Sequence, residues 1–116
     1  MGVKKTNPLG EIIITDEVIA RIAGIAATEC YGIVGMASKR ATDGIVELLG
    51  SENLSRGIKV RTQDNVVTID IYIIVEYGIS IATVAQNVIE KVKYTVEDLA
   101  GVDVGKVNVT VEGVRV

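Results

Sequence analysis

The chain has 116 residues, of which 48% are hydrophobic, and its 12 basic and 15 acidic side chains give a net charge of −3. The 35 Val and Ile residues exclude intrinsic disorder, and the absence of His excludes imidazole chemistry. The acidic balance is not that of a nucleic-acid-binding protein. Length and composition together predict one soluble, β-branched-rich α/β domain.

The N-terminal segment lacks the apolar stretch of a signal peptide, and no apolar run approaches the length of a membrane span. A lone Cys30 excludes an intrachain disulfide and indicates a reducing compartment. These features predict a cytoplasmic protein with no direct membrane insertion. Residues 1–9 are expected to form a flexible tail ending near the sole proline, Pro8, and residues 10–116 a single domain.

The first half of the domain should contain a strand over residues 10–14 and then a helix. Thr15 is a suitable N-cap, and Asp16 and Glu17 are acids in the first turn, where they favour the helix dipole. Gly32 is expected to end the helix. The apolar positions with helical spacing are Val18, Ile19, Ile22, Ala23, Ala26 and Cys30.

A less regular segment follows. Residues 33–37 are predicted to be extended, residues 45–49 suggest one or two turns of helix, and residues 51–56 suggest a loop.

The second half is more regular. Alternating polar and apolar residues predict strands over 58–63 and 66–76, joined by a two-residue turn at Asp64 and Asn65. A second helix is expected between Ser80 and Gly101. Its apolar stripe is Ile81, Ala85, Val88, Val92, Val96 and Leu99. A last strand covers residues 106–111, and the alternation then slips, which predicts a bulge at residues 112–113.

The order strand, helix, insert, hairpin, helix, strand predicts an α+β fold. The simplest arrangement of these elements is a two-layer sandwich of the split βαβ kind, in which two helices cover one face of a mainly antiparallel sheet.

The sequence offers no candidate catalytic residue, cofactor site or metal site. Cys30 lies on the apolar stripe of the first helix and is interpreted as a core residue. Gly32 and Gly35 form a GxxG spacing like that of KH-type RNA-binding loops, but the two residues between them are apolar. The pattern therefore favours a glycine at a helix end, and no nucleic-acid partner is expected.

Two surfaces are candidates for self-association. Val66, Tyr72 and Ile74 alternate on the sheet face opposite the main apolar row, where they would form an exposed apolar patch if the helices cover one face. Ala20, Gly24 and Ala27 form a small-residue stripe on the first helix. That stripe suits either close approach of another backbone or packing within the chain.

The chain resembles the alkaline shock protein family of Gram-positive bacteria, through residues 10–19, 22–36, 75–78, 81–88 and 107–114. The resemblance implies a non-enzymatic, cytosolic, self-associating protein of the envelope stress response, in the short form that lacks a charged tail. It implies two alternative partners besides a second copy: a membrane-anchor protein, or a kinase-like protein acting on fatty acids or dihydroxyacetone that this chain would assist. RNA binding through a KH-like fold is a less favoured alternative.

Overall fold

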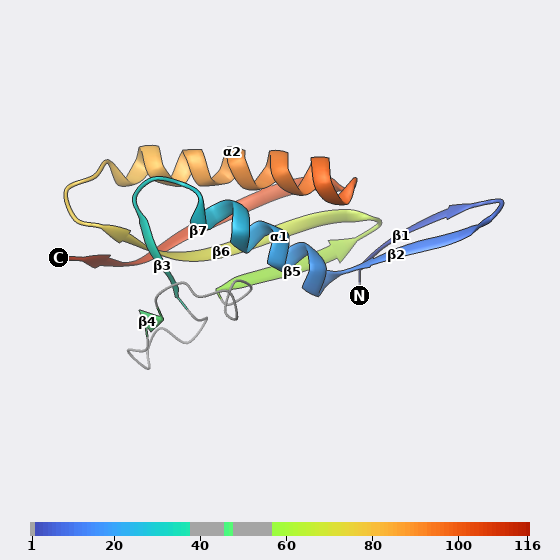
Figure 1. Cartoon of the computed structure of the whole chain (residues 1–116), viewed down its shortest axis with the longest axis horizontal. Helices are drawn as coiled ribbons and strands as arrows, with labels where there is room; N and C mark the ends of the chain where they lie inside the picture. Colours follow the sequence, from blue (N-terminus) through green and yellow to red (C-terminus); the bar gives the residue numbers. More distant parts are fainter. Residues whose placement is uncertain (1, 38–45, 48–56) are drawn as a thin grey trace.

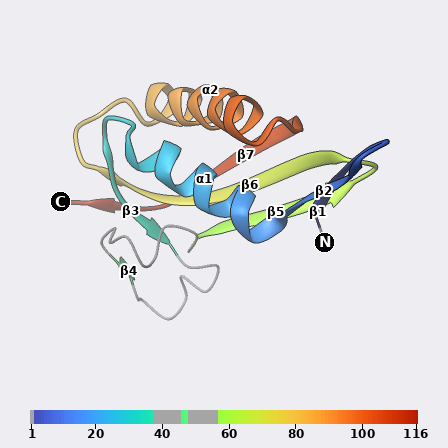
Figure 2. The same cartoon turned by 45° about the vertical axis from the view of Figure 1, so that its right-hand side comes forward.

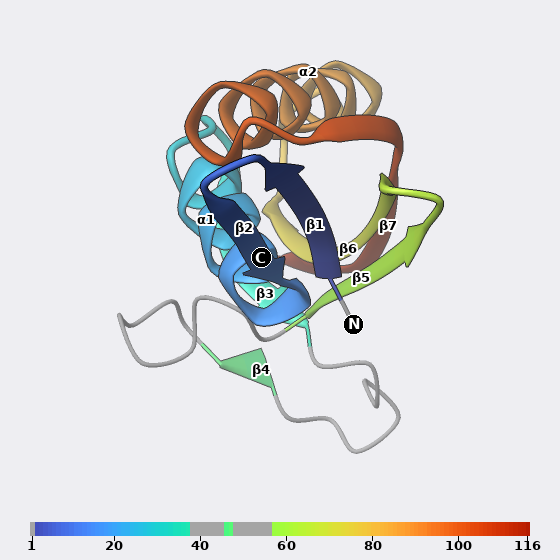
Figure 3. The ribbon, with the colours of Figure 1, turned by 90° about the vertical axis from the view of Figure 1, so that its right-hand side faces the viewer.

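The computed structural model describes residues 2–37, 46–47 and 57–116 and shows an α+β architecture (Figure 1). Its elements are β1 (Gly2–Asn7), β2 (Gly10–Thr15), α1 (Asp16–Thr28), β3 (Ile33–Ala37), β4 (Val46–Glu47), β5 (Ile58–Gln63), β6 (Val66–Glu76), α2 (Ile81–Ala100) and β7 (Asp103–Arg115). Seen along its length, the larger sheet curves around the two helices, which lie on its concave face (Figure 3). The predicted fold class is confirmed.

Strand β6 is the centre of the larger sheet. It pairs in parallel with β7 along its length, from Val66 opposite Asp103 to Glu76 opposite Arg115. It pairs antiparallel with β5 through residues 66–71 and with β3 through residues 73–75, so these two short strands share its other edge. Helix α2 is the crossover between the parallel strands β6 and β7, which makes a βαβ unit.

The core lies between β6 and the helices. The inward row of β6 is fully buried and consists of Val67, Ile69, Ile71, Ile73 and Val75. Helix α2 faces it with Val84, Val88, Val92 and Val96. The predicted helical stripes are confirmed in their middle and wrong at three positions, because Val18, Ile81 and Leu99 are exposed.

The N-terminal residues differ from the sequence prediction. Residues 2–7 are not a tail: they form β1, which pairs with β2 in a separate two-stranded sheet. The Asn7 side chain closes this hairpin, because its Oδ1 accepts hydrogen bonds from the N–H groups of Leu9 and Gly10 at 2.8 and 3.1 Å. The strand expected over residues 10–14 therefore pairs with β1 rather than with the larger sheet.

The predicted hairpin turn and the predicted β-bulge are both confirmed. Asp64 and Asn65 have φ of 52° and 63°, as a two-residue hairpin turn requires. The register of β7 against β6 shifts between Val111 and Gly113, which places the bulge at Glu112.

Of the short helix expected over residues 45–49, the structure describes Val46–Glu47 alone, and these form strand β4 beside β3. The loop expected over residues 51–56 lies outside the described residues.

Candidate interaction surfaces

The outer face of the larger sheet does not carry the single apolar patch predicted from Val66, Tyr72 and Ile74. Val66 is 42% exposed, but Tyr72 is half-buried and Ile74 is 6% exposed. Ile74 is buried beside two glycines, because Gly35 and Gly113 are its neighbours in register on β3 and β7. A Cβ atom on Gly113 would lie 3.1 Å from Cδ1 of Ile74. The expectation that Ile74 is exposed is therefore wrong.

A polar cluster separates Val66 from Tyr72 on this face. Asp70 forms an ion pair with Nη2 of Arg61 at 3.0 Å. It also accepts a hydrogen bond from Nδ2 of Asn108 at 2.9 Å. Since a strand rises about 3.3 Å per residue, Val66 and Tyr72 are about 20 Å apart. The two side chains cannot form one contiguous apolar contact.

The small-residue stripe of α1 lies inside the chain. Ala20 is 7% exposed, Gly24 is buried and Ala27 is 0% exposed. Helix α1 packs against α2 and β5. Of the two uses that the sequence left open, the structure places these residues in intrachain packing.

The β1–β2 hairpin is a surface that the sequence prediction missed. It extends beyond the end of the larger sheet and lengthens the molecule to 54 Å (Figures 1 and 2). Three of its apolar residues are open to solvent: Leu9 is 99% exposed, Ile12 54% and Ile13 60%. Ile12 pairs with Lys5 and Ile13 with Lys4, so the two isoleucines lie on opposite faces. Both faces of the projecting arm thus carry exposed apolar surface.

Three contacts hold the base of the hairpin on the body. Val3 is 2% exposed and belongs to the main core. The side-chain amide of Asn65 binds the backbone of Lys4 twice: Oδ1 accepts from the Lys4 N–H and Nδ2 donates to the Lys4 carbonyl, both at 3.2 Å. Nζ of Lys5 donates to the carbonyl of Gly101 at the C-terminal end of α2, where the helix dipole favours a positive charge.

The tip of the hairpin has no such contact with the other residues that the structure describes. An isolated two-stranded hairpin is marginally stable in water, and exposed apolar side chains are unfavourable there. The Lys4–Glu11 ion pair at 3.2 Å is exposed, so it contributes little to the stability of the hairpin. The arm therefore combines a fixed base with an exposed apolar end.

The Cys30 thiol is partly buried against the core. Its Sγ lies 3.6 Å from the carbonyl of Ala26. Burial raises the pKa of the Cys30 thiol, with the Lys91 charge opposing this rise. A thiol of raised pKa holds less thiolate at neutral pH.

We expect Cys30 of the folded protein to react with a disulfide reagent at pH 7 more slowly than the same residue in urea-unfolded protein. The rate should rise with pH through a higher range than that of a free cysteine. Stopped-flow absorbance measures both rates. Equal rates would show that the thiol is not shielded.

Gly32, the first glycine of the GxxG spacing, has a packing role. Its φ is +89°, a conformation that L residues rarely adopt, and a Cβ there would lie 2.7 Å from Cδ1 of Ile79. Its carbonyl accepts a hydrogen bond from the N–H of Glu76 at 2.9 Å. This glycine allows the loop after α1 to lie against the loop between β6 and α2.

Helix α1 itself ends earlier than predicted, at Thr28.

The start of β7 is held by two side chains of α2. Oε2 of Glu97 accepts from Nζ of Lys93 at 3.1 Å and from the N–H of Val104 at 3.2 Å, and Nζ of Lys93 donates to the Val104 carbonyl at 3.1 Å. The bond from Lys93, and after it the bond from Val104, lower the pKa of Glu97 from its ordinary value of 4.5.

Because the pKa of Glu97 is lower in the folded state, its stabilising contribution is present above pH 4.5 and is lost as pH falls through the lowered value. We expect Glu97→Gln to reduce Tm at pH 7 and to have a shrinking effect below pH 4.5. Lys93→Gln should reduce the same pH dependence, because the bond from the Val104 N–H to Glu97 remains. Thermal unfolding followed by circular dichroism from pH 2 to 8 measures this. Plots of Tm against pH that run parallel for wild type and Glu97→Gln would contradict this prediction.

The described residues hold neither a metal-binding cluster nor a membrane-spanning helix. Across residues 2–37, 46–47 and 57–116 there is no group of three or more Cys, Asp or Glu side chains that could hold a metal ion. Neither α1 nor α2 is long and apolar enough to cross a membrane.

Comparison with known proteins finds one family and several relatives. A family model described as "ASP23 family, cell envelope-related function" matches residues 4–116. The chain is 52% identical to the uncharacterized protein YloU of Bacillus subtilis, over 100% of this chain and 98% of that protein. It is 39% identical to the uncharacterized protein Spy1614 of Streptococcus pyogenes, over 100% of this chain and 97% of that protein.

A more distant relative has a descriptive name. The stress response regulator gls24 homolog of Streptococcus pyogenes is 26% identical over 91% of this chain and 59% of that protein. No solved structure is significantly similar to the chain.

Proposed function

The chain belongs to the ASP23 (alkaline shock protein) family, and from that premise we propose that it is a non-enzymatic interaction module of the envelope stress response. In this proposal the protein associates with itself and docks on a partner protein near the membrane. The family description, a cell envelope-related function, and the stress-response name of a distant relative support the setting.

The observation that carries the docking part of the proposal is the projecting β1–β2 hairpin. Its isoleucines at positions 12 and 13 are more than half exposed on opposite faces, while its base is fixed by Val3 and by the Asn65 amide. Each aliphatic side chain that a partner buries contributes about 1.5–3 kcal/mol. A rigid base lowers the entropy that a partner must remove on binding.

We expect Ile13→Glu to lose the docking partner. The tagged protein would be captured at native expression level from detergent-treated cells of its own bacterium, and co-purifying proteins identified by mass spectrometry. In the proposal a membrane-anchored protein is recovered with wild type and reduced at least tenfold with Ile13→Glu. Val18→Glu is the matched control, because Val18 is also exposed but lies on α1.

The identity of the partner decides between the alternatives. A hairpin-dependent membrane-anchored protein supports docking near the membrane. If a kinase subunit is recovered with wild type and lost with Ile13→Glu, the result would instead support a role as an accessory of that kinase. If RNA is recovered in the same way, the result would support RNA binding through a KH-like fold. Equal recovery of every partner with wild type and Ile13→Glu would overturn the role of the hairpin.

A further inference from the structure

Strand β7 is an edge strand of unusual length. It runs for 13 residues and pairs with β6 along one edge. Among the strands that the structure describes, none pairs with its other edge. Alternate backbone amides of a strand point to each side, so an unpaired edge presents free N–H and C=O groups to another chain.

Side-chain contacts occupy the start of this edge, and no described strand pairs with its middle. At the start, Lys93 and Glu97 occupy the backbone groups of Val104. Register shifts against β6 fall at Gly105 and at Glu112. Between these irregularities lies a regular, uncharged run, residues 107–111, in which four of the five residues are β-branched and which suits strand pairing.

The sequence of β7 is complementary to itself when it is read in opposite directions from Val109. Lys106 then lies opposite Glu112, Asn108 opposite Thr110, and Val107 opposite Val111. The same register continues outward, with Gly105 opposite Gly113 and Asp103 opposite Arg115. Each opposed pair thus joins opposite charges, two polar residues, two valines or two glycines.

The faces of the strand agree with this register. Val107, Val109 and Val111 pair with the buried row of β6 and so face the helices. Asn108 and Thr110 pair with Asp70 and Tyr72 of β6, so they lie on the outer face. Facing residues of an antiparallel pair share a side of the sheet, so valine would meet valine inside and the polar pair would meet outside.

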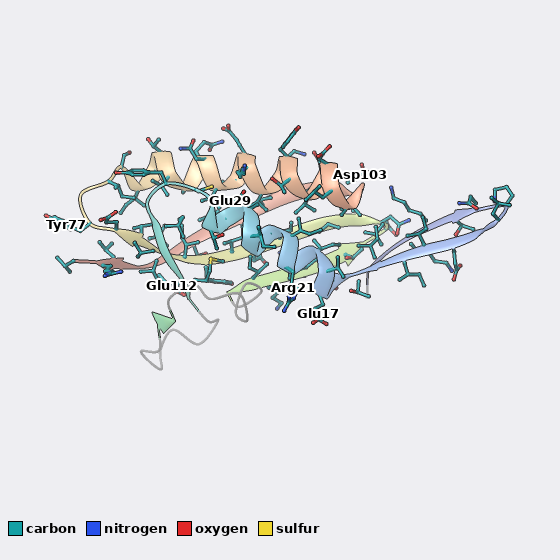
Figure 4. The ribbon with its side chains drawn as sticks, viewed as in Figure 1. Glu17, Arg21, Glu29, Tyr77, Asp103 and Glu112 are labelled. Carbon is teal, nitrogen blue, oxygen red and sulfur yellow. The ribbon has the colours of Figure 1, made fainter. Side chains whose placement is uncertain are left out.

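Four charged residues of β7 also lack a charged partner among the residues that the structure describes. Asp103, Lys106, Glu112 and Arg115 have no side-chain ion pair or hydrogen bond to any residue that the structure describes. Asp103 and Glu112 lie toward opposite ends of β7 (Figure 4). A second copy in the antiparallel register would place one opposite charge beside each Lys106 and each Glu112, so the Lys106–Glu112 pair would occur twice in the dimer, once on each side of the symmetry axis.

We propose that β7 pairs with β7 of a second copy in antiparallel orientation, about a two-fold axis at Val109. Residues 107–111 form the ladder, Lys106 and Glu112 flank it, and the two larger sheets become one continuous sheet. The pairing covers the half-buried Val109 and Val111. This inference deepens the self-association in the proposed function and uses a surface separate from the hairpin.

A charge-reversal cycle tests the register. Lys106→Glu and Glu112→Lys each place like charges opposite one another, and the double variant restores opposite charges. Sedimentation equilibrium should show a wild-type dimer, a Kd at least tenfold weaker for each single variant, and a double variant within about threefold of wild type. Arg21→Glu and Glu17→Lys on α1 are controls with the same changes in net charge, and both should dimerise like wild type. Figure 4 shows Arg21 and Glu17 on α1, away from β7.

A crosslink tests the axis. Facing Cα atoms in an antiparallel pair are about 4.5–5.5 Å apart, within reach of a disulfide. In a Cys30→Ala background, Val109→Cys should form a covalent dimer under mild oxidation, and Asn87→Cys on α2 should not. This readout does not depend on the effect of a charge change on folding, which circular dichroism checks for every variant.

The outcomes separate this inference from the proposed function. A wild-type monomer at several hundred micromolar would overturn both the β7 pairing and self-association. A dimer that persists in both single reversal variants, or that is not rescued in the double variant, would overturn the β7 pairing alone. Failure of the hairpin to retain a partner would leave the β7 result unaffected.

Discussion

Ile71→Ala is expected to lower the free energy of unfolding by about 2–5 kcal/mol, because it opens a cavity in the middle of the core. Ile71 is fully buried and lies at the centre of the larger sheet, opposite Ile58 of β5 and Val109 of β7. All three strands meet at this position, so the surrounding backbone has little freedom to collapse into the space. Urea denaturation followed by circular dichroism measures the loss.

Val66→Ala is the matched control for Ile71→Ala. Val66 begins the same strand but is 42% exposed on the outer face, and a surface substitution of this kind changes stability by about 0.5 kcal/mol. A similar loss in both variants would contradict the assignment of the inward row of β6 as the core.

Asn65→Gly is expected to release the β1–β2 hairpin from the body. The substitution keeps the positive φ of 63° that the turn needs and removes the two hydrogen bonds to the Lys4 backbone. Each such bond contributes about 0.5–1.5 kcal/mol, so we expect a loss of about 1–3 kcal/mol. Amide hydrogen exchange should show faster exchange at Lys4, whose N–H donates to Asn65.

Two comparisons make this result specific to the hairpin. The amide of Ile71, in the centre of β6, should keep most of its protection in Asn65→Gly. Asn65→Ala should cost about 1–2 kcal/mol more than Asn65→Gly, because alanine is unfavourable at a left-handed φ. An unchanged exchange rate at Lys4 in Asn65→Gly would mean that the other base contacts suffice to hold β1.

The elements that the sequence predicted well are those with a local cause. The two-residue turn at Asp64 and Asn65 follows from residues that tolerate positive φ, and the alternation on both sides determines the inward rows of β5 and β6. The bulge at Glu112 appears in the sequence as a one-residue slip in the valine alternation. The family resemblance rested on short runs of glycine and apolar residues spread along the chain, and the family model matches residues 4–116.

The candidate surfaces could not be predicted because their exposure depends on residues distant in the sequence. Ile74 alternates as an outward residue, yet Gly35 and Gly113 on the two neighbouring strands leave space that its side chain occupies. The stripe at Ala20 was open to two interpretations until the position of α2 was known.

The hairpin shows the same limit. Nothing near residues 2–7 indicates that Asn65, 61 positions away from Lys4, binds their backbone. The sequence by itself determined the class of fold, the inward rows, the turns and the family, because periodicity and turn chemistry act over a few residues. The tertiary structure alone decided which apolar side chains remain exposed and which strand forms the edge of the sheet, because both depend on strand pairing across the chain. The charge symmetry of β7 is present in the sequence, but it gains a physical meaning from the fold, in which no described strand pairs with the outer edge of β7.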